Sequence, residues 1–554
     1  MGLTRREVLI AGLGIAAVGC TSGDDGDASA TVEPDPATDA STTAPTTAAP
    51  TTTTAPAPVV PPAFARDENP FTLGVGSGDP DETSVVLWTR LLGGQEALEA
   101  DYFVAVDVAL DAEFTDLVSS ELAEAPFEYG NSVHYIAENL DPDSWYWYRF
   151  RIGEEVSATG RTRTMPSDDT PMRLGFSSCQ HWETGAYAAH RHLASADLDI
   201  SVWLGDYIYE TGAAFFGVVT SQGERTHDGP EIETLEAYRA RYGLYKSDIH
   251  LQAHHAARPW VVTWDDHEVQ NNYAAGVSAA GQDAATFAER QIAARQAWWE
   301  HMPVRLDPPE GDGLVIHRSV RWGTLVDLHM LDGRQYRDPQ PTDGEPVELP
   351  GVGNLGLRRL GPTARDESHS MLGSEQRQWL EAQVAGSTTT WNVLGNQVFM
   401  HGLNAFPGDS AATNTDTWDG YFGERQALLG TLAESTSNLI ILSGDFHASS
   451  TADVRADPFA LETPIVATEF MAPAISSLFP SGLTSIAPLV LGFNPQIVHF
   501  EPRNGFMTCE VTPETWTTTL HVLDDVTNEN SELSVAGEFT VRAGTPGIDD
   551  FSVS

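Results

Sequence analysis

The sequence predicts an α/β protein in which a small antiparallel β-sandwich precedes a larger, layered domain of mixed α/β structure. Three observations support this prediction. Between residues 71 and 164, short segments of alternating polar and apolar residues are separated by turn residues, a pattern typical of sandwich strands. From residue 172 onward, short apolar runs alternate with longer helix-like runs, as in layered α/β domains. The length of 554 residues also exceeds that of one ordinary domain.

Composition indicates a folded and strongly acidic protein. Hydrophobic residues make up 41% of the chain and aromatic residues 9%, which is enough for a packed core. The 30 basic residues against 79 acidic ones give a net charge of −49, and Lys246 is the only lysine. Because this charge repels nucleic acid backbones, we expect no binding of duplex nucleic acid through a basic face. Three cysteines in so long a chain also exclude a disulfide-rich scaffold.

Residues 1–19 predict an export signal. Arg5 and Arg6 precede an apolar stretch over residues 10–18 that is too short to span a membrane. The paired arginines resemble the twin-arginine signal, and the residues that end at Cys20 resemble a lipobox. We therefore expect twin-arginine export, lipidation of Cys20, and a location on the outer face of the cell membrane or outside the cell. An ordinary signal with an incidental cysteine is the alternative.

Residues 20–65 are rich in Thr, Ala and Pro and include four consecutive threonines, Thr51 to Thr54. Such a composition cannot bury enough apolar surface to offset the entropy lost on ordering. We predict a disordered tether that holds the folded part of the chain away from the membrane.

Residues 66–165 carry the pattern of the sandwich. Strands are predicted over residues 71–75, 85–89, 102–110 and 146–152. Leu140-Asp141-Pro142, followed by aromatic residues from Trp145 to Tyr148, resembles the tyrosine-corner region of fibronectin-type sandwiches. A domain boundary is expected near residues 165–168.

Residues 170–540 are predicted to form the layered domain. Buried strands are expected over residues 172–178, 200–204, 260–264, 391–395 and 438–443, and antiparallel strands near 498–500, 507–511 and 517–522. Helices are expected over residues 234–245, 284–301 and 374–384, the last with Ser374 as N-cap and Gly386 after its end. Gly544 and Pro546 argue against a helical lid at the C-terminus.

Segments that contain polar residues immediately follow five of the predicted strands. They are Cys179-Gln180-His181, Gly205-Asp206-Tyr207-Ile208-Tyr209-Glu210, Asp265-Asp266-His267-Glu268, Asn396-Gln397 and Gly444-Asp445-Phe446-His447. Each alone has a structural alternative, such as a helix cap for Asp206. Ligand sites of open α/β sheets gather at the carboxyl ends of strands, so the five together predict one site.

The residue types of this site favour metal ions over a covalent nucleophile. The chain has neither the Gly-x-Ser-x-Gly elbow of serine hydrolases nor a phosphate-binding loop that ends in Gly-Lys-Ser/Thr. Thiolate, phenolate and imidazole favour a transition ion such as iron, whereas oxygen ligands favour Ca²⁺, Mg²⁺ or Mn²⁺. Two unlike metals are therefore expected.

At these positions the sequence resembles the alkaline phosphatase D (PhoD-like) family of metallophosphatases. The resemblance extends over residues 71–522 and rests on Phe71 to Pro80, Val86 to Arg90, Ser178-Cys179-Gln180, Gly205 to Glu210, Trp264 to Val269 with Asn271-Asn272-Tyr273, Leu331 to Asp338, and Ser443 to His447. It implies a four-layer αββα metallophosphoesterase domain behind a fibronectin-like β-sandwich domain, with Fe³⁺ and one or two Ca²⁺ as cofactors.

The resemblance also implies roles for individual residues. The iron would be held by Cys179, Asp206, Tyr209 and His447. Asp206 would also bridge to calcium, and the calcium side would be completed by Asp266, Asn396 and Asp445. Asp265 is an alternative to Asp266. Asn271, Asn272 and Arg337 would contact the phosphate or a further calcium ion.

The expected activity is hydrolysis of phosphate esters by attack of a metal-bound hydroxide, without a covalent enzyme intermediate. His267 would stabilise the transition state or protonate the leaving oxygen, or alternatively orient Asp266. We expect a monomeric, membrane-anchored phosphoesterase of the alkaline phosphatase D type. A phosphodiesterase or phospholipase-type hydrolase on the same site is one alternative, and a non-catalytic surface-binding lipoprotein rigidified by metals is another.

Overall fold

The computed structural model describes residues 3–4, 56–64, 68–93, 98–213, 219–220, 223–311, 313–349, 356–408 and 410–554. The two arginines of the predicted signal, Cys20 and most of the predicted tether lie outside these residues. Residues 56–64, the described end of that tether, lie against the sandwich. There the Val59 carbonyl accepts a hydrogen bond from the Arg151 guanidinium at 2.9 Å, and the Pro62 carbonyl accepts one from the Gly153 amide at 2.7 Å. The chain therefore contacts the sandwich before residue 66.

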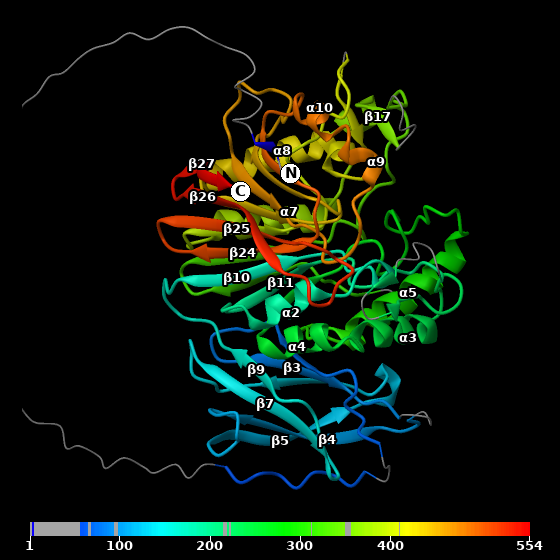
Figure 1. Cartoon of the computed structure of the whole chain (residues 1–554), viewed down its shortest axis with the longest axis vertical. Helices are drawn as coiled ribbons and strands as arrows, with labels where there is room; N and C mark the ends of the chain where they lie inside the picture. Colours follow the sequence, from blue (N-terminus) through cyan, green and yellow to red (C-terminus); the bar gives the residue numbers. More distant parts are fainter. Residues whose placement is uncertain are drawn as a thin grey trace, which may run out of the picture.

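The N-terminal part is a sandwich of two antiparallel sheets, as predicted, at the lower end of Figure 1. One sheet contains β2 (Val75–Gly78), β3 (Val85–Arg90) and β6 (Ser132–Ala137), and the other contains β4 (Tyr102–Ala109), β5 (Leu117–Ala125), β7 (Trp145–Ile152), β8 (Glu155–Val156) and β9 (Gly160–Arg163), with a 3₁₀ turn at Phe127–Tyr129. Buried side chains of both sheets, including Leu87, Val106 and Tyr148, form its core.

Two details of the sandwich test the sequence analysis. The strand predicted at residues 71–75 is wrong, because Gly74 donates a hydrogen bond to Phe71 at 3.1 Å and closes a turn, which moves β2 to Val75–Gly78. The tyrosine corner is confirmed. The Tyr146 hydroxyl accepts a hydrogen bond from the backbone amide of Asp141 at 2.7 Å.

The layered domain contains two large sheets. The first has the order β1-β23-β21-β22-β20-β18-β16-β15, with β1 (Leu3–Thr4), β15 (Arg318–Trp322), β16 (Val326–Met330), β18 (Trp391–Gly395), β20 (Leu439–Ser443), β21 (Ser449–Val454), β22 (Ala467–Met471) and β23 (Ile497–Glu501). The second has the order β27-β26-β25-β24-β10-β11-β14-β2-β3-β6, with β10 (Met172–Ser177), β11 (Ile200–Leu204), β14 (Trp260–Thr263), β24 (Gly505–Val511), β25 (Thr515–Leu523), β26 (Leu533–Arg542) and β27 (Thr545–Val553). Short hairpins β12 (Val219–Thr220) with β13 (Gly223–Glu224) and β17 (Leu357–Arg359) with β19 (Ala412–Asn414) lie outside them.

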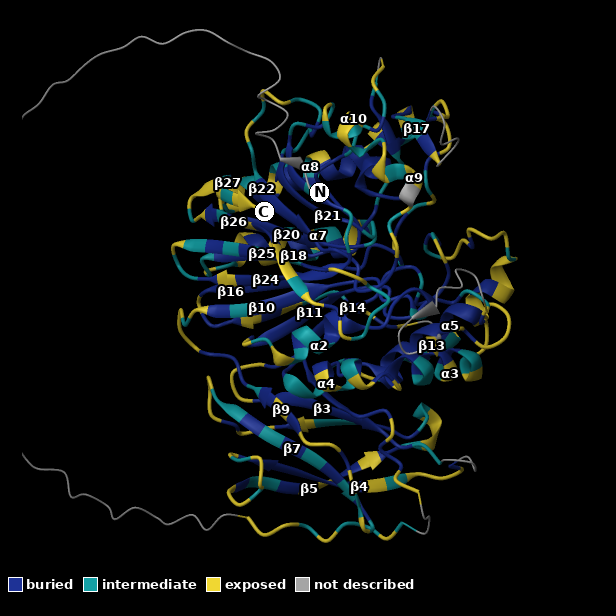
Figure 2. Cartoon of the chain, in the orientation of Figure 1, coloured by how far each residue is buried: buried dark blue, intermediate teal, exposed yellow. Residues whose placement is uncertain are grey.

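The two sheets pack face to face between two layers of helices. Leu174 and Val202 from one sheet share a core with Val393 and Ile440 from the other. The helices α2 (Ala188–Ser195), α3 (Leu235–Lys246), α4 (Ile249–Ala257) and α5 (Ala284–His301) cover the outer face of the second sheet, and α7 (Gly373–Gly386) and α8 (Phe422–Ser435) cover that of the first. Buried residues run through the centre of the stack in Figure 2. The four-layer αββα architecture is confirmed.

The sandwich and the layered domain share one continuous sheet. Strand β14 pairs in parallel with β2, with Trp260 opposite Gly78, so three sandwich strands extend the ten-stranded sheet. A pattern of apolar residues along one strand gives no information about such a junction.

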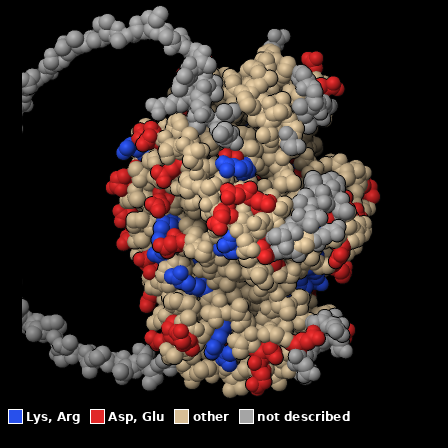
Figure 3. Space-filling model, viewed as in Figure 1, with Lys and Arg blue, Asp and Glu red and all other residues tan. Residues whose placement is uncertain are grey.

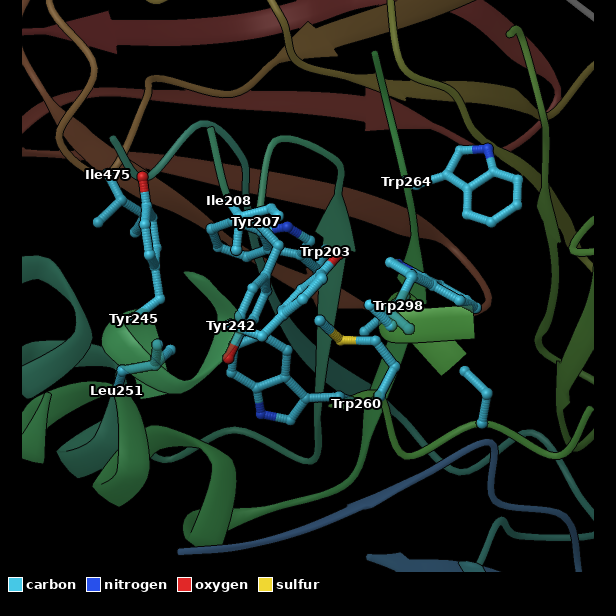
Figure 4. Close-up of a cluster of buried hydrophobic side chains, with 14 of the residues drawn as sticks. Trp203, Tyr207, Ile208, Tyr242, Tyr245, Leu251, Trp260, Trp264, Trp298 and Ile475 are labelled. Carbon is cyan, nitrogen blue, oxygen red and sulfur yellow. The ribbon is translucent and has the colours of Figure 1, made fainter. Parts of the chain in front are cut away.

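Aromatic side chains fill the space between the second sheet and its helices. Figure 4 shows Trp203 and Trp260 from the strands facing Tyr242 from α3, with Trp298 from α5 against Trp264. This core fixes the strand ends β11 and β14, from which the site residues project.

The three predicted helices are present, with corrections at their ends, and the helix predicted over residues 234–245 is α3 at Leu235–Lys246. Helix α5 matches residues 284–301, and Asp283 caps it. Ser374 is not the N-cap of α7, because the helix begins at Gly373, whose amide donates to the Ser370 hydroxyl at 2.8 Å. Gly386 is the last residue of α7 rather than one that follows it.

The C-terminus is a β-hairpin formed by β26 and β27, in agreement with the predicted absence of a terminal helix. Short helices α6 (Pro362–Arg365), α9 (Ser481–Thr484) and α10 (Ala487–Leu491) and 3₁₀ turns at Trp182–Thr184 and Trp418–Tyr421 complete the described elements. Among the described helices, none has both the length and the apolar character required to cross a membrane. Acidic side chains outnumber basic ones on the face shown in Figure 3.

Candidate metal centre

The predicted site residues follow five neighbouring strands and gather at one edge of the two sheets. Cys179 follows β10, Asp206 follows β11, Asp266 follows β14, Asn396 follows β18 and Asp445 follows β20. These strands run parallel within each sheet, so their carboxyl ends lie at the same edge.

One group of side chains combines a thiol, a carboxylate, an imidazole and a phenol. Ligand atoms of Cys179, Asp206 and His447 lie within 4.8 Å of one another. The Tyr209 hydroxyl lies 2.9 Å from Asp206 Oδ2 and 3.1 Å from His447 Nε2. The structure thus brings together all four residues that the sequence analysis assigned to iron.

A second group contains only carboxylates. Oxygens of Asp206, Asp265, Asp266 and Asp445 lie within 4.8 Å of one another. Asp206 belongs to both groups, which is the position that a bridging ligand requires. Asp265 and Asp266 both lie in this group, so the alternative between them stays open.

The spacing within Gly205-Asp206-Tyr207-Ile208-Tyr209 has a simple structural reason. Tyr207 and Ile208 are fully buried in the aromatic core (Figure 4). Asp206 and Tyr209 instead contact each other and lie near the other candidate ligands. A Cβ atom on Gly205 would lie 2.4 Å from the Cβ of Asp265, so a glycine allows the two strand ends to approach.

The Glu268 carboxylate fixes the same two strand ends. It accepts backbone hydrogen bonds from Asp206 at 3.1 Å, from Tyr207 at 2.6 Å and from Asp265 at 2.9 Å. Sequence analysis gave Glu268 no role, although it lies within the quoted motif.

Four of the candidate ligands have strained backbone conformations. Cys179, Asp206, Asp445 and His447 have φ values between 55° and 65°, the left-handed region that non-glycine residues rarely adopt. Each such residue costs on the order of 1 kcal/mol or more, and such conformations cluster at functional sites. No sequence pattern reports this feature.

The electrostatics of the site favour a bound cation. Burial and the neighbouring Asp206 raise the pKa of the Cys179 thiol and of the Tyr209 phenol well above their usual values. Burial and the charges of Asp266 and Asp265 likewise raise the pKa of Asp206. Within the described residues, Asp206 Oδ1, Asp265 Oδ2 and Asp266 Oδ1 are buried without a hydrogen-bond partner. Buried, unpartnered anionic oxygens of this kind fit metal coordination.

Arg334, which sequence analysis did not assign, lies inside the acidic group. Its guanidinium binds Asp265 through Nε and Asp416 through Nη1 at 2.9 Å, and Nη2 lies 3.6 Å from both Asp266 and Asp445. Arg334 is fully buried. Its positive charge offsets part of the repulsion among the four carboxylates.

His267 lies beside the two groups and contacts Glu210, a second residue to which the sequence analysis gave no role. Its Nδ1 lies 2.6 Å from Glu210 Oε2, and its ring centroid lies 4.1 Å from that of Tyr209. Burial alone would lower the pKa of His267, but the charges of Glu210, Asp206 and Asp266 raise it well above its usual value. A ligand nitrogen of His267 lies within 4.8 Å of ligand oxygens of Asp206 and Asp266.

The remaining predicted residues make contacts with the protein near the site. Asn271 and Asn272 use their backbone amides, which donate to Glu210 at 2.7 Å and to Asp266 at 2.6 Å. The Arg337 guanidinium binds the Asp416 carboxylate at 2.8 Å and the Tyr273 carbonyl at 2.7 Å.

Asn396 is buried at the end of β18. Its side-chain oxygen accepts a hydrogen bond from the Trp418 indole at 3.3 Å, which leaves one lone pair for a further contact. Cys179 and Cys509, the two described cysteines, are buried and unpaired.

Comparisons with known proteins agree with this geometry. The PhoD-like phosphatase family model matches residues 174–520, and the model of the N-terminal domain of PhoD-like phosphatases matches residues 53–166. Alkaline phosphatase D of Bacillus subtilis (strain 168) is 37% identical over 490 residues, which are 86% of this chain and 82% of that protein.

Solved structures extend the comparison. A structure of PhoD superposes with a TM-score of 0.80 at 35% identity and covers 88% of this chain and 94% of its own. A purple acid phosphatase, PPD1 from yellow lupin seeds, gives 0.51 at 10% identity and covers 85% and 73%, a likeness of fold alone. The predicted resemblance is confirmed, and the chain belongs to the PhoD-like phosphatase family.

Proposed function

We propose that this phosphatase hydrolyses phosphate esters at a centre of two kinds of metal ion, Fe³⁺ and one or two Ca²⁺. The observation that supports this proposal is the position of Asp206, which is shared by the thiol-containing group and the carboxylate group. Cys179, Asp206, Tyr209 and His447 would hold the iron, and Asp206, Asp266, Asn396 and Asp445 would hold calcium. When bound, such a pair polarises phosphoryl oxygens and lowers the pKa of coordinated water.

His267 holds the proton that the leaving oxygen needs. Nδ1 lies 2.6 Å from the Glu210 carboxylate, which accepts a hydrogen bond from it in the protonated imidazole, and the charge of Glu210 raises the pKa of His267. Among its described contacts the ring binds Glu210 rather than Asp266, which favours proton donation over the alternative role of orienting Asp266.

The test of this function uses the purified mature chain. We expect stoichiometric iron and calcium by elemental analysis, and hydrolysis of a chromogenic phosphomonoester or phosphodiester. The relative rates on the two esters distinguish a phosphatase from a phosphodiesterase. An active protein with two zinc ions would refute the metal assignment, and a metal-loaded protein that hydrolyses neither ester would refute the function.

Tyr209 supplies a spectroscopic prediction. A phenolate bound to ferric iron absorbs visible light by charge transfer, so the wild-type protein should be coloured and Tyr209→Phe should lose the colour at equal iron content. Tyr187→Phe, which removes a buried hydroxyl bonded to the Gln180 carbonyl, is the matched control and should keep the colour. A colourless wild type with full iron occupancy would contradict the assignment.

The export proposal rests on the sequence. We infer that twin-arginine export and lipidation of Cys20 anchor the enzyme on the outer face of the membrane. Cys20→Ser should move activity from the membrane fraction to the soluble fraction of cells that express the full chain. If wild type and variant fractionate alike, Cys20 is not the anchor.

A further inference from the structure

The structure contains an apolar cavity of about 280 Å³ next to the metal centre. Fifteen of its eighteen lining residues are apolar, and the polar ones are His401, Asn414 and Ser450. Strand ends β18, β20 and β22 and the helices α9 and α10 surround it, at the end of the molecule opposite the sandwich in Figure 1. Apart from Phe446, its lining residues were not part of the predicted site.

Three phenylalanines form the border that the cavity shares with the metal centre. Phe446 lies between Asp445 and His447, and Phe399 follows Asn396 on the same loop. The ring of Phe446 contacts Phe399 at 5.3 Å and Phe479 at 5.8 Å between centroids. The same loop that carries Phe479 carries Ser477, whose hydroxyl lies 2.7 Å from that of Tyr209.

The chemistry of the lining restricts what the cavity can hold. Among the described residues, no lysine or arginine lines the cavity, so a second phosphate or another anionic group would find no counter-charge there. His401 Nδ1 is already bound to Glu469 at 2.8 Å. Burial in the cavity would instead make the binding of an uncharged, apolar group more favourable.

We propose that this cavity is a subsite for the apolar alkyl part of a phosphoester substrate, whose phosphoryl group lies at the metal centre. This inference rests on the proposed function, because it places the phosphorus at the candidate ligands. The preferred substrates are then amphiphilic esters of apolar alcohols. Ala487 and Val490 of α10 line the cavity and would contact the alkyl group of the substrate.

The test measures competitive inhibition by alkylphosphonates of increasing chain length, from methyl to octyl, below their aggregation concentrations, with a chromogenic phosphoester as substrate. Each methylene that enters the cavity should lower the inhibition constant about fourfold. Ala487→Phe, which fills the cavity, should abolish this dependence on chain length. Leu489→Phe, two residues along α10, is the matched control, because Leu489 is 59% exposed and does not line the cavity, and it should keep the dependence.

The outcomes separate the two proposals. If the wild type hydrolyses no phosphoester, the proposed function fails. If the substrate is hydrolysed and methylphosphonate inhibits, but longer chains inhibit no better, the subsite is refuted while the function stands. An equal dependence on chain length in the wild type and Ala487→Phe would also refute the subsite.

Discussion

Removing the proposed calcium ion should abolish phosphoester hydrolysis while the protein stays folded and keeps the proposed iron. The carboxylate group offers oxygen ligands alone, and a hard cation held by oxygens exchanges faster than iron held by a thiolate and a phenolate. Loss of a residue that merely supports a metal ligand costs about 10–100-fold in affinity or activity, so loss of the ion itself should cost at least about 100-fold. The test compares activity, iron content and circular dichroism before and after treatment with a calcium-selective chelator.

Two variants refine the calcium prediction. Asp266→Asn removes one negative charge from the cluster of four aspartates, so the calcium concentration for half-maximal rate should rise. His267→Ala should lower kcat with little change in that concentration, because the proposed role of His267 is to protonate the leaving oxygen and not to bind calcium. Activity that survives chelation, or a full recovery with magnesium in place of calcium, would contradict the calcium assignment.

Arg334→Met should destabilise the protein by about 3–5 kcal/mol, the cost of leaving buried charges without their partner. The substitution keeps the volume of the side chain but leaves Asp265 without its cation and Asp416 with Arg337 alone. All these side chains are buried, so water cannot replace the lost contacts. Urea unfolding of the metal-free protein measures the change, since bound metals would offset part of the repulsion.

Arg542→Met is the matched control for Arg334→Met. Arg542 pairs with Asp549 at 2.6 Å, but its side chain is 61% exposed, and surface pairs contribute about 0–1 kcal/mol. Adding Asp265→Asn to Arg334→Met should restore part of the lost stability, because it removes the carboxylate that the first change leaves unpaired. Equal stability of the two single variants would show that Arg334 does not neutralise the acidic group.

The sequence by itself determined most strands and the long helices of the layered domain. Strands β11 and β18 have the predicted bounds, because a strand buried on both faces needs apolar side chains at successive positions. Helix α5 also has the predicted bounds, because Asp283 caps its first turn and Pro303 follows its end.

The candidate ligands could also be identified from the sequence. Polar residues directly after apolar strands stand out, and parallel strands of one sheet bring their ends together. That argument predicts which residues meet at the sheet edge. It gives neither the left-handed backbone of Cys179, Asp206, Asp445 and His447 nor the shared position of Asp206 between two ligand groups.

Only the tertiary structure decided which charged side chain enters the site. Arg334 and Arg337 lie three residues apart in one motif, yet Arg334 lies among the carboxylates and Arg337 binds Asp416 and a carbonyl outside them. The partners of Arg334 lie 69 and 82 residues away along the chain. The periodicity of apolar residues in a segment predicts which side of that segment is buried. The partner of a buried charge depends instead on which distant loops the packed sheets bring together.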